Sequence, residues 1–146
     1  MGMFGGGQSG GGLEKIFSKI EQLKVDSANL KAVISNPDLT TFVGVCIPEF
    51  LSVYETERLV QELTTFDIDI FNLVVNQIVF PDEDSKCKQC LSRFKMQRKY
   101  LDQVNDLYDD FHVILMPLEG SEIRGVDRLS AYSAKLLLEK KLPKIN

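Results

Sequence analysis

Two cysteines stand three positions apart in the stretch CKQC at residues 87–90, a spacing typical of metal ligands and of redox pairs. A structural zinc site takes four ligands, and one such pair supplies two of them. The chain has one further cysteine, Cys46, in an apolar run, and one histidine, His112, at the start of a predicted strand. Because both of these residues belong to predicted strands, the local sequence offers no third ligand.

Three interpretations of Cys87 and Cys90 follow. A two-fold axis beside the pair would bring in the same pair from a second copy and complete a four-cysteine zinc site, and the sequence favours this interpretation. A redox pair would open a helix directly after a strand, where the helix dipole lowers a thiol pKa. Here the acidic stretch PDEDSK precedes the pair, and we expect it to raise the pKa. The third interpretation is that the two thiols have no function and lie at the surface, where they would be open to oxidation.

A second group of polar residues lies near the carboxyl-terminal half of one predicted strand and directly after the next strand. Asn76 interrupts the apolar stretch FNLVVNQIVF at 71–80, and the segment PLEGSEIRG at 117–125 follows the next strand. Ligands of open parallel sheets bind beyond the carboxyl ends of the strands. An amide both donates and accepts hydrogen bonds, so Asn76 could recognise the edge of a base. A satisfied amide in the core is the alternative.

The elements that must position these residues alternate along the chain. An apolar helical pattern runs from Leu13 to Asn36–Pro37, where the helix should end. The pattern then predicts strands at 40–46, 71–80 and 112–116, and helices at 52–66, 88–111 and 126–138. This alternation predicts an α/β fold with a parallel sheet and flanking helices, and the apolar strands should be buried.

The composition limits the class of protein. With 146 residues and 44% apolar side chains, the chain can form a compact domain with its own core. A net charge of −4 argues against a general nucleic-acid binder, and no apolar run approaches the ~20 residues of a membrane span. The few cysteines suit a reducing, cytosolic compartment. The glycine-rich segment 1–12 should be flexible, as a tether, an artefact or a cut inside a longer chain.

Two kinds of catalytic site are not expected. The sequence has no G-x-x-x-x-G-K-[S/T] motif, so no P-loop is available to cradle phosphates. His112 is the only histidine, which nearly excludes a histidine-based triad.

Five stretches together resemble one family. The chain is similar to the C-terminal part of the eukaryotic ATPases that target tail-anchored membrane proteins, within the arsenite-pump family of P-loop ATPases. The stretches are PDLTTFVGVCIPEFLSVYETERLVQEL (37–63), VVNQIVF (74–80), CKQC (87–90), KMQRKYLDQVNDLYDDFHV (95–113) and MPLEGSEIRG (116–125). The resemblance implies a SIMIBI-type P-loop fold: segment 13–36 as one helix of the helical client-binding subdomain, and 37–146 as the C-terminal part of the ATPase domain.

The resemblance also implies site residues. The nucleotide would contact Glu49, Asn76 and the loop that begins at Pro117 and Leu118, and no catalytic residue lies in this chain. Zinc would be held across a homodimer by Cys87 and Cys90 of each copy. The client's transmembrane helix would contact one stripe of the first helix, namely Leu13, Ile16, Phe17, Ile20 and Leu23.

The function implied by the resemblance is ATP hydrolysis with Mg²⁺, coupled to delivery of tail-anchored proteins from the cytoplasm to a receptor at the endoplasmic reticulum. The P-loop, the switch regions and the catalytic aspartate would belong to an N-terminal half, so this chain alone should not hydrolyse ATP. Gly44 stands where the family often has the first cysteine of a C-x-C motif. A nucleotide-independent, zinc-linked holdase and an arsenite-pump ATPase are the alternatives.

Overall fold

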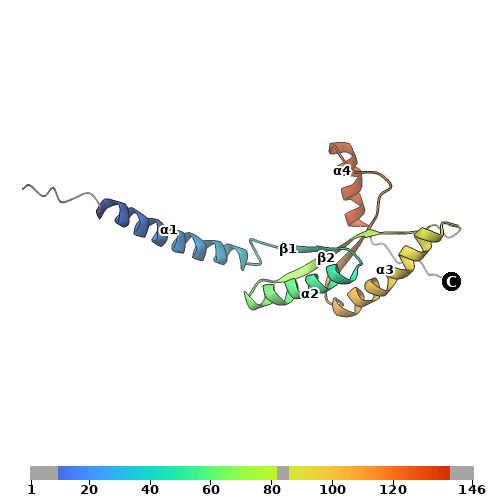
Figure 1. Ribbon diagram of the computed structural model, residues 1–146, viewed down its shortest axis with the longest axis horizontal. Helices are drawn as coiled ribbons and strands as arrows, with labels where there is room; N and C mark the ends of the chain where they lie inside the picture. The colour runs from blue at the N-terminus through green and yellow to red at the C-terminus, as the bar shows by residue number, and fades with distance from the viewer. Residues whose placement is uncertain (1–9, 82–85, 139–146) are drawn as a thin grey trace, which may run out of the picture. The chain divides into compact units, whose positions relative to one another are not determined.

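The computed structural model describes residues 10–81 and 86–138, and the chain divides into two units, Met1–Thr40 and Thr41–Asn146. The first unit consists of helix α1, Gly10–Ile34 (Figure 1). It begins before the expected Leu13, and the first nine residues of the segment predicted to be flexible lie outside the described residues. The helix ends where Asn36–Pro37 predicted, and the Asn36 side chain accepts a hydrogen bond from the Asp38 N–H at 2.9 Å.

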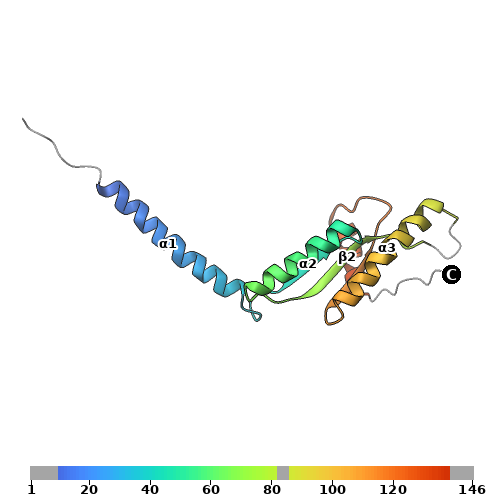
Figure 2. The ribbon, with the colours of Figure 1, turned by 60° about the horizontal axis from the view of Figure 1, so that its bottom comes forward.

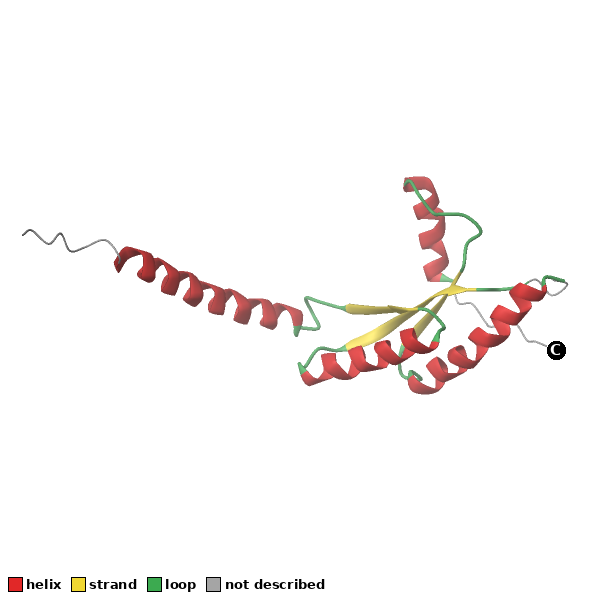
Figure 3. Ribbon diagram, in the orientation of Figure 1, coloured by secondary structure: helices red, strands yellow, loops and turns green. Residues whose placement is uncertain are grey.

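The second unit is a parallel sheet with helices, which confirms the α/β fold class. The strand order is β1-β2-β3, and both neighbouring pairs are parallel. Figure 3 shows strand and helix alternating as the sequence predicted. The elements are β1 (Phe42–Cys46), α2 (Phe50–Thr65), β2 (Ile70–Ile78), α3 (Lys88–Leu107), β3 (His112–Pro117), α4 (Val126–Ser133) and the 3₁₀ turn η1 (Ala134–Leu137).

The core of the second unit lies between the sheet and helices α2 and α3. Helices α2 and α3 lie on the same side of the sheet in both ribbon views (Figures 1 and 2). The buried cluster draws residues from β1, β2, α2 and α3: Cys46, Val53, Leu73, Val75, Ile78, Leu101, Val104 and Tyr108. The burial predicted for Cys46 is confirmed. The apolar seam expected on α3 is confirmed at its centre, whereas Leu91 is 40% exposed.

The opposite face of the sheet corrects the prediction that the strand at 40–46 is buried. Val43 and Val45 are 52% and 65% exposed. Side chains alternate between the two faces of a strand, and α2 and α3 cover only the face to which Cys46 belongs. The prediction is therefore wrong for every second residue of β1.

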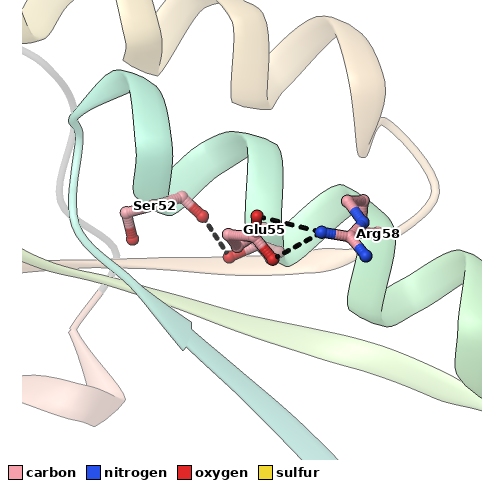
Figure 4. A network of polar contacts seen from close by, with 4 residues as sticks. Ser52, Glu55 and Arg58 are labelled. Atoms are coloured by element: carbon pink, nitrogen blue, oxygen red, sulfur yellow. Dashed lines mark hydrogen bonds and ion pairs between the residues drawn. The ribbon is translucent and has the colours of Figure 1, made fainter.

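The turn between β1 and α2 is held by the first turn of the helix. The Ser52 hydroxyl oxygen accepts a hydrogen bond from the Ile47 N–H at 3.0 Å, and the Thr56 hydroxyl donates to the Ser52 carbonyl at 2.7 Å. Farther along α2, Arg58 pairs with Glu55 at 3.1 Å, where both side chains are 60% exposed (Figure 4). An exposed pair of this kind adds little stability, so α2 is held mainly by its buried face.

Helix α3 is shorter than predicted. It ends at Leu107, where the last helical bond runs from the Tyr108 N–H to the Val104 carbonyl at 3.0 Å. None of the helices among the described residues has both the length and the apolarity that crossing a membrane requires.

Candidate functional site

Asn76 lies in a bulge at the carboxyl end of β2. The register between β2 and β3 shifts between Val75 and Ile78, and Gln77 adopts a φ of 60°. A bulge disrupts the hydrogen-bond ladder locally and turns a side chain in a new direction, and bulges often occur beside ligand sites. The two polar residues that interrupt the apolar stretch are therefore the residues that form the irregularity.

The Asn76 side chain has both lone pairs of its oxygen engaged. Asn76 Oδ1 accepts from the Gln77 N–H at 2.8 Å and from the Tyr132 hydroxyl at 3.0 Å. Within the described ranges, no hydrogen bond is formed by Asn76 Nδ2, and the side chain is half-buried. Asn76 is thus oriented by two donors while its own two donors stay available, which is not the environment of a satisfied core amide.

A cavity of about 400 Å³ opens beside this amide. Its volume suits a small-molecule ligand, since such pockets commonly measure 300–1,000 Å³. The structure therefore brings Asn76 together with Pro117 and Leu118 at one cavity, and their contact with a nucleotide stays a prediction. The lining residues come from the bulge, the loop after β3 and helix α4: Asn76, Gln77, Pro117, Leu118, Glu119, Ser121, Glu122, Ile123, Leu129 and Tyr132.

The loop on the far side of the cavity is tied to β2 and to η1. The Leu118 N–H donates to the Ile78 carbonyl at 2.8 Å, and Lys135 forms an ion pair with Glu119. Burial, and after it the negative charge of Glu119, raises the pKa of Tyr132, so this phenol is held in its neutral, donating form. The wall of the cavity is therefore built from three separate segments of the chain.

The two thiols lie at the N-terminus of α3. Cys87 is the N-cap residue, and its sulfur accepts from the Cys90 N–H at 3.4 Å. The hydrogen bond from the Cys90 thiol, followed by those from backbone N–H groups, lowers the pKa of Cys87, and the same thiol contact raises the pKa of Cys90. The net direction for Cys87 is thus downward, whereas the effect expected of the acidic stretch stays a prediction, because residues 82–85 lie outside the described residues.

The donor set of this pair fits half of a zinc site. Cys87 is exposed, Cys90 is partly buried, and neither is in a disulfide. Among the residues that the structure places, no three Cys, His, Asp or Glu side chains come close enough to hold a metal ion. Two soft thiol donors on one helical turn suit Zn²⁺, but a closed site needs two more ligands.

The sequence matches a known family over nearly its whole length. The family model for anion-transporting ATPases covers residues 2–138. The chain belongs to this ATPase family. An α/β fold with a parallel three-stranded sheet and flanking helices is in keeping with part of such an ATPase domain.

Individual members of the family are identical to this chain at half or more of the aligned positions. ATPase ASNA1 homolog 2 of Paramecium tetraurelia is 55% identical over 133 residues, which is 91% of this chain and 40% of the relative. ATPase GET3 of Meyerozyma guilliermondii is 51% identical over 135 residues, 92% of this chain and 38% of the relative. ATPase GET3 of Scheffersomyces stipitis is 50% identical over 147 aligned positions, which cover 100% of this chain and 41% of the relative. The chain thus spans about two fifths of the length of these ATPases.

One residue expected at the ATPase nucleotide site lies apart from the cavity. Glu49 is the N-cap residue of α2, and its Oε1 lies 3.6 Å from Nη2 of Arg93 on α3. Both side chains are nearly half exposed, so the pair contributes little to stability. The structure does not bring Glu49 to the cavity lined by Asn76.

The residues expected to contact a client all lie on α1. Leu13, Ile16, Phe17, Ile20 and Leu23 are each more than half exposed within the described residues. An apolar stripe left open on a helix is a surface that binds other apolar groups. Their role in client binding stays a prediction.

Sequence reasoning missed two residues that line the cavity and one residue that holds the bulge behind it. Leu129 and Tyr132 come from α4, and their spacing of three on a helix directly after the loop is the signal that could have found them. Gln97 on α3 was passed over because a glutamine does not extend an apolar seam, yet it is 1% exposed. Its two hydrogen bonds reach the bulge itself.

Proposed function

We propose that this chain forms the adenine side of the ATP site of an ATPase that targets tail-anchored membrane proteins. The observation that carries this proposal is the Asn76 amide, whose donors face no partner among the described residues and which lines the cavity. Membership in the ATPase family and the similarity to proteins named ATPase GET3 support it.

The hydrogen-bond pattern of Asn76 favours adenine over guanine. Because Oδ1 already accepts two bonds, the side chain can only donate to a ligand. Adenine presents an unprotonated N1 on its Watson–Crick edge, whereas guanine carries a hydrogen there. With Asn76 Nδ2 at the N1 position, adenine would meet the amide with an acceptor and guanine with a second donor, and an unpaired donor in a partly buried site costs about 1–3 kcal/mol. Pro117, Leu118 and Ile123 supply apolar surface for the plane of the base.

Hydrolysis would depend on groups outside these residues. Phosphoryl transfer needs a cradle for the triphosphate together with Mg²⁺, and the sequence contains no P-loop motif. We therefore assign to this chain the recognition of the base, and assign the triphosphate and Mg²⁺ to the remainder of the ATPase. On the strength of the family resemblance, we propose that the whole protein acts in the cytoplasm and delivers its client to a receptor at the endoplasmic reticulum.

Zinc is proposed as a structural ion shared by two copies. Cys87 and Cys90 would supply two thiolates, and the same residues of a second copy the other two. The support is the presence of two cysteines on one turn, neither of them in a disulfide, and the lack of a third ligand among the described residues. When bound, the ion would hold two α3 N-termini together.

The experiment uses a chimera in which this chain replaces the matching segment of ATPase GET3 from Meyerozyma guilliermondii. Asn76→Ala should weaken ATP binding by about 1–3 kcal/mol, roughly 5- to 150-fold, and reduce the preference for ATP over GTP. Asn105→Ala, which truncates an exposed asparagine on α3, is the matched control and should change neither. Unchanged affinity and base preference in Asn76→Ala would show that the amide does not recognise the base.

A further inference from the structure

One buried side chain of α3 holds the bulge that carries Asn76. Gln97 is 1% exposed. Its Oε1 accepts from the Val79 N–H at 3.0 Å, and its Nε2 donates to the Gln77 carbonyl at 3.0 Å. The amide therefore spans the bulge from one side to the other and bonds to backbone groups that lie 18 and 20 residues away along the chain.

These bonds replace what the bulge takes away. Where the register between β2 and β3 shifts, backbone groups lose their partners in the ladder, and a buried backbone group without a partner is costly. Gln77 also has a φ of 60°, which residues other than glycine seldom adopt and which persists only where the surroundings hold it. A carboxamide offers a donor and an acceptor in one plane, which suits one backbone carbonyl and one backbone N–H on either side of the bulge.

The same bulge orients both walls of the cavity. The Gln77 N–H donates to Asn76 Oδ1 at 2.8 Å, while the Gln77 carbonyl accepts from Gln97. The next residue, Ile78, accepts from the Leu118 N–H at 2.8 Å and so ties down the loop opposite. Gln97 thus acts on Asn76 through a single residue, Gln77, without lining the cavity itself.

We propose that Gln97 is a positioning residue for base recognition, which fixes the direction of the Asn76 amide through the bulge and thereby sets the preference for adenine. This inference rests on the proposed function, in which Asn76 donates to the base. Without the Gln97 bonds, Gln77 is free to leave its left-handed conformation. The donor to Asn76 Oδ1 then moves, and the amide loses one of the two contacts that orient it.

The test measures the ratio of ATP affinity to GTP affinity in the chimera described above. Gln97→Met keeps the length of the side chain and removes both hydrogen bonds, and it should lower the ratio about 5- to 30-fold. Gln97→Glu keeps the acceptor for Val79 but, once ionised, sets a second acceptor against the Gln77 carbonyl, so it should also lower the ratio. Gln103→Met, at an exposed glutamine on the same helix, should leave the ratio unchanged.

Two further measurements separate the inference from the proposed function. The double variant Asn76→Ala with Gln97→Met should have the same ratio as Asn76→Ala alone, because Gln97 acts through Asn76. If Asn76→Ala leaves the ratio unchanged, the proposed function fails. If Asn76→Ala lowers the ratio while Gln97→Met weakens ATP and GTP equally or not at all, only the inference is overturned. Should Gln97→Met fail to fold, the ratio measured for Gln97→Glu decides in the same way.

Discussion

Cys46 shows how burial controls a reactive group. It is 3% exposed at the end of β1, and burial raises the pKa of its thiol to about 11, an effect that a hydrogen bond with Thr56 partly offsets. A thiol of this kind is a poor nucleophile at neutral pH. Cys46 therefore contributes to packing and not to reactivity, whereas the thiol of Cys87 is exposed.

The raised pKa of Cys46 predicts a loss of stability at alkaline pH. In the unfolded chain the thiol ionises near its ordinary value of 9.0, whereas in the folded chain it stays protonated up to about 11. The contribution is complete below pH 9 and is lost as the pH rises to 11, so the free energy of unfolding should fall by roughly 2 kcal/mol. Urea denaturation at pH 8 and pH 11 measures the fall.

The matched control for this effect is Cys46→Ala. The variant should be less stable at neutral pH, because it leaves a small cavity, but its stability should fall less between pH 8 and pH 11. An equal fall in both proteins would assign the alkaline loss to other groups.

At the scale of elements, α1 differs from the other helices because, among the described residues, its unit contains no second helix or strand that could pack on it. A helix in water is marginal without tertiary contacts, and α1 exposes apolar side chains along most of its length. The exposed stripe suits a partner that is apolar on all sides, and a transmembrane helix is such a partner. Packing against other helices of the ATPase is the competing explanation.

The two explanations predict different responses to charge. In the chimera, Ile20→Asp with Leu23→Asp should abolish capture of a tail-anchored segment. ATP hydrolysis and zinc content should stay near normal, because neither the residues that line the Asn76 cavity nor the thiol pair lie on α1. Crosslinking to a photoreactive tail anchor measures capture. Ser18→Asp with Ser27→Asp, which adds the same charge at exposed polar positions, is the control. Loss of ATPase activity together with capture would identify the stripe as structural packing.

At the scale of the whole molecule, one face of the sheet is exposed at β1, and the thiol pair could form half of a zinc site. Parallel sheets in α/β proteins are covered on both faces, yet Val43 and Val45 are open on one face here. This fits a chain that spans about two fifths of its relatives' length. Among the described residues the thiol pair has no third ligand, and in the proposed zinc site a second copy would supply two more.

The shared zinc site predicts a fixed stoichiometry. The purified chimera should contain about half a zinc ion per chain, and Cys87→Ser should lose zinc and the zinc-dependent dimer together. Elemental analysis and sedimentation velocity measure the two properties. Cys46→Ala is the matched control and should keep both. One full zinc ion per chain in a protein that sediments as a single copy would contradict the shared site.

The sequence by itself determined the order of the elements, the parallel sheet and the position of Asn76 in the carboxyl-terminal half of a strand. These features follow from local signals, since apolar periodicity and breaks such as Asn36–Pro37 act within a few residues. Helix ends were predicted less well: α2 begins at Phe50 rather than Ser52, and α3 ends at Leu107 rather than at residue 111.

Only the tertiary structure decided which polar groups meet. Gln97 reads in the sequence as a polar break in an apolar seam, and its burial becomes understandable only when a bulge 18 to 20 residues earlier presents one free N–H and one free carbonyl. Tyr132 reaches Asn76 across 56 residues. Periodicity in the sequence reports which face of an element is apolar, but a buried hydrogen bond depends on where two distant segments cross, and that is settled by the packing of the whole domain.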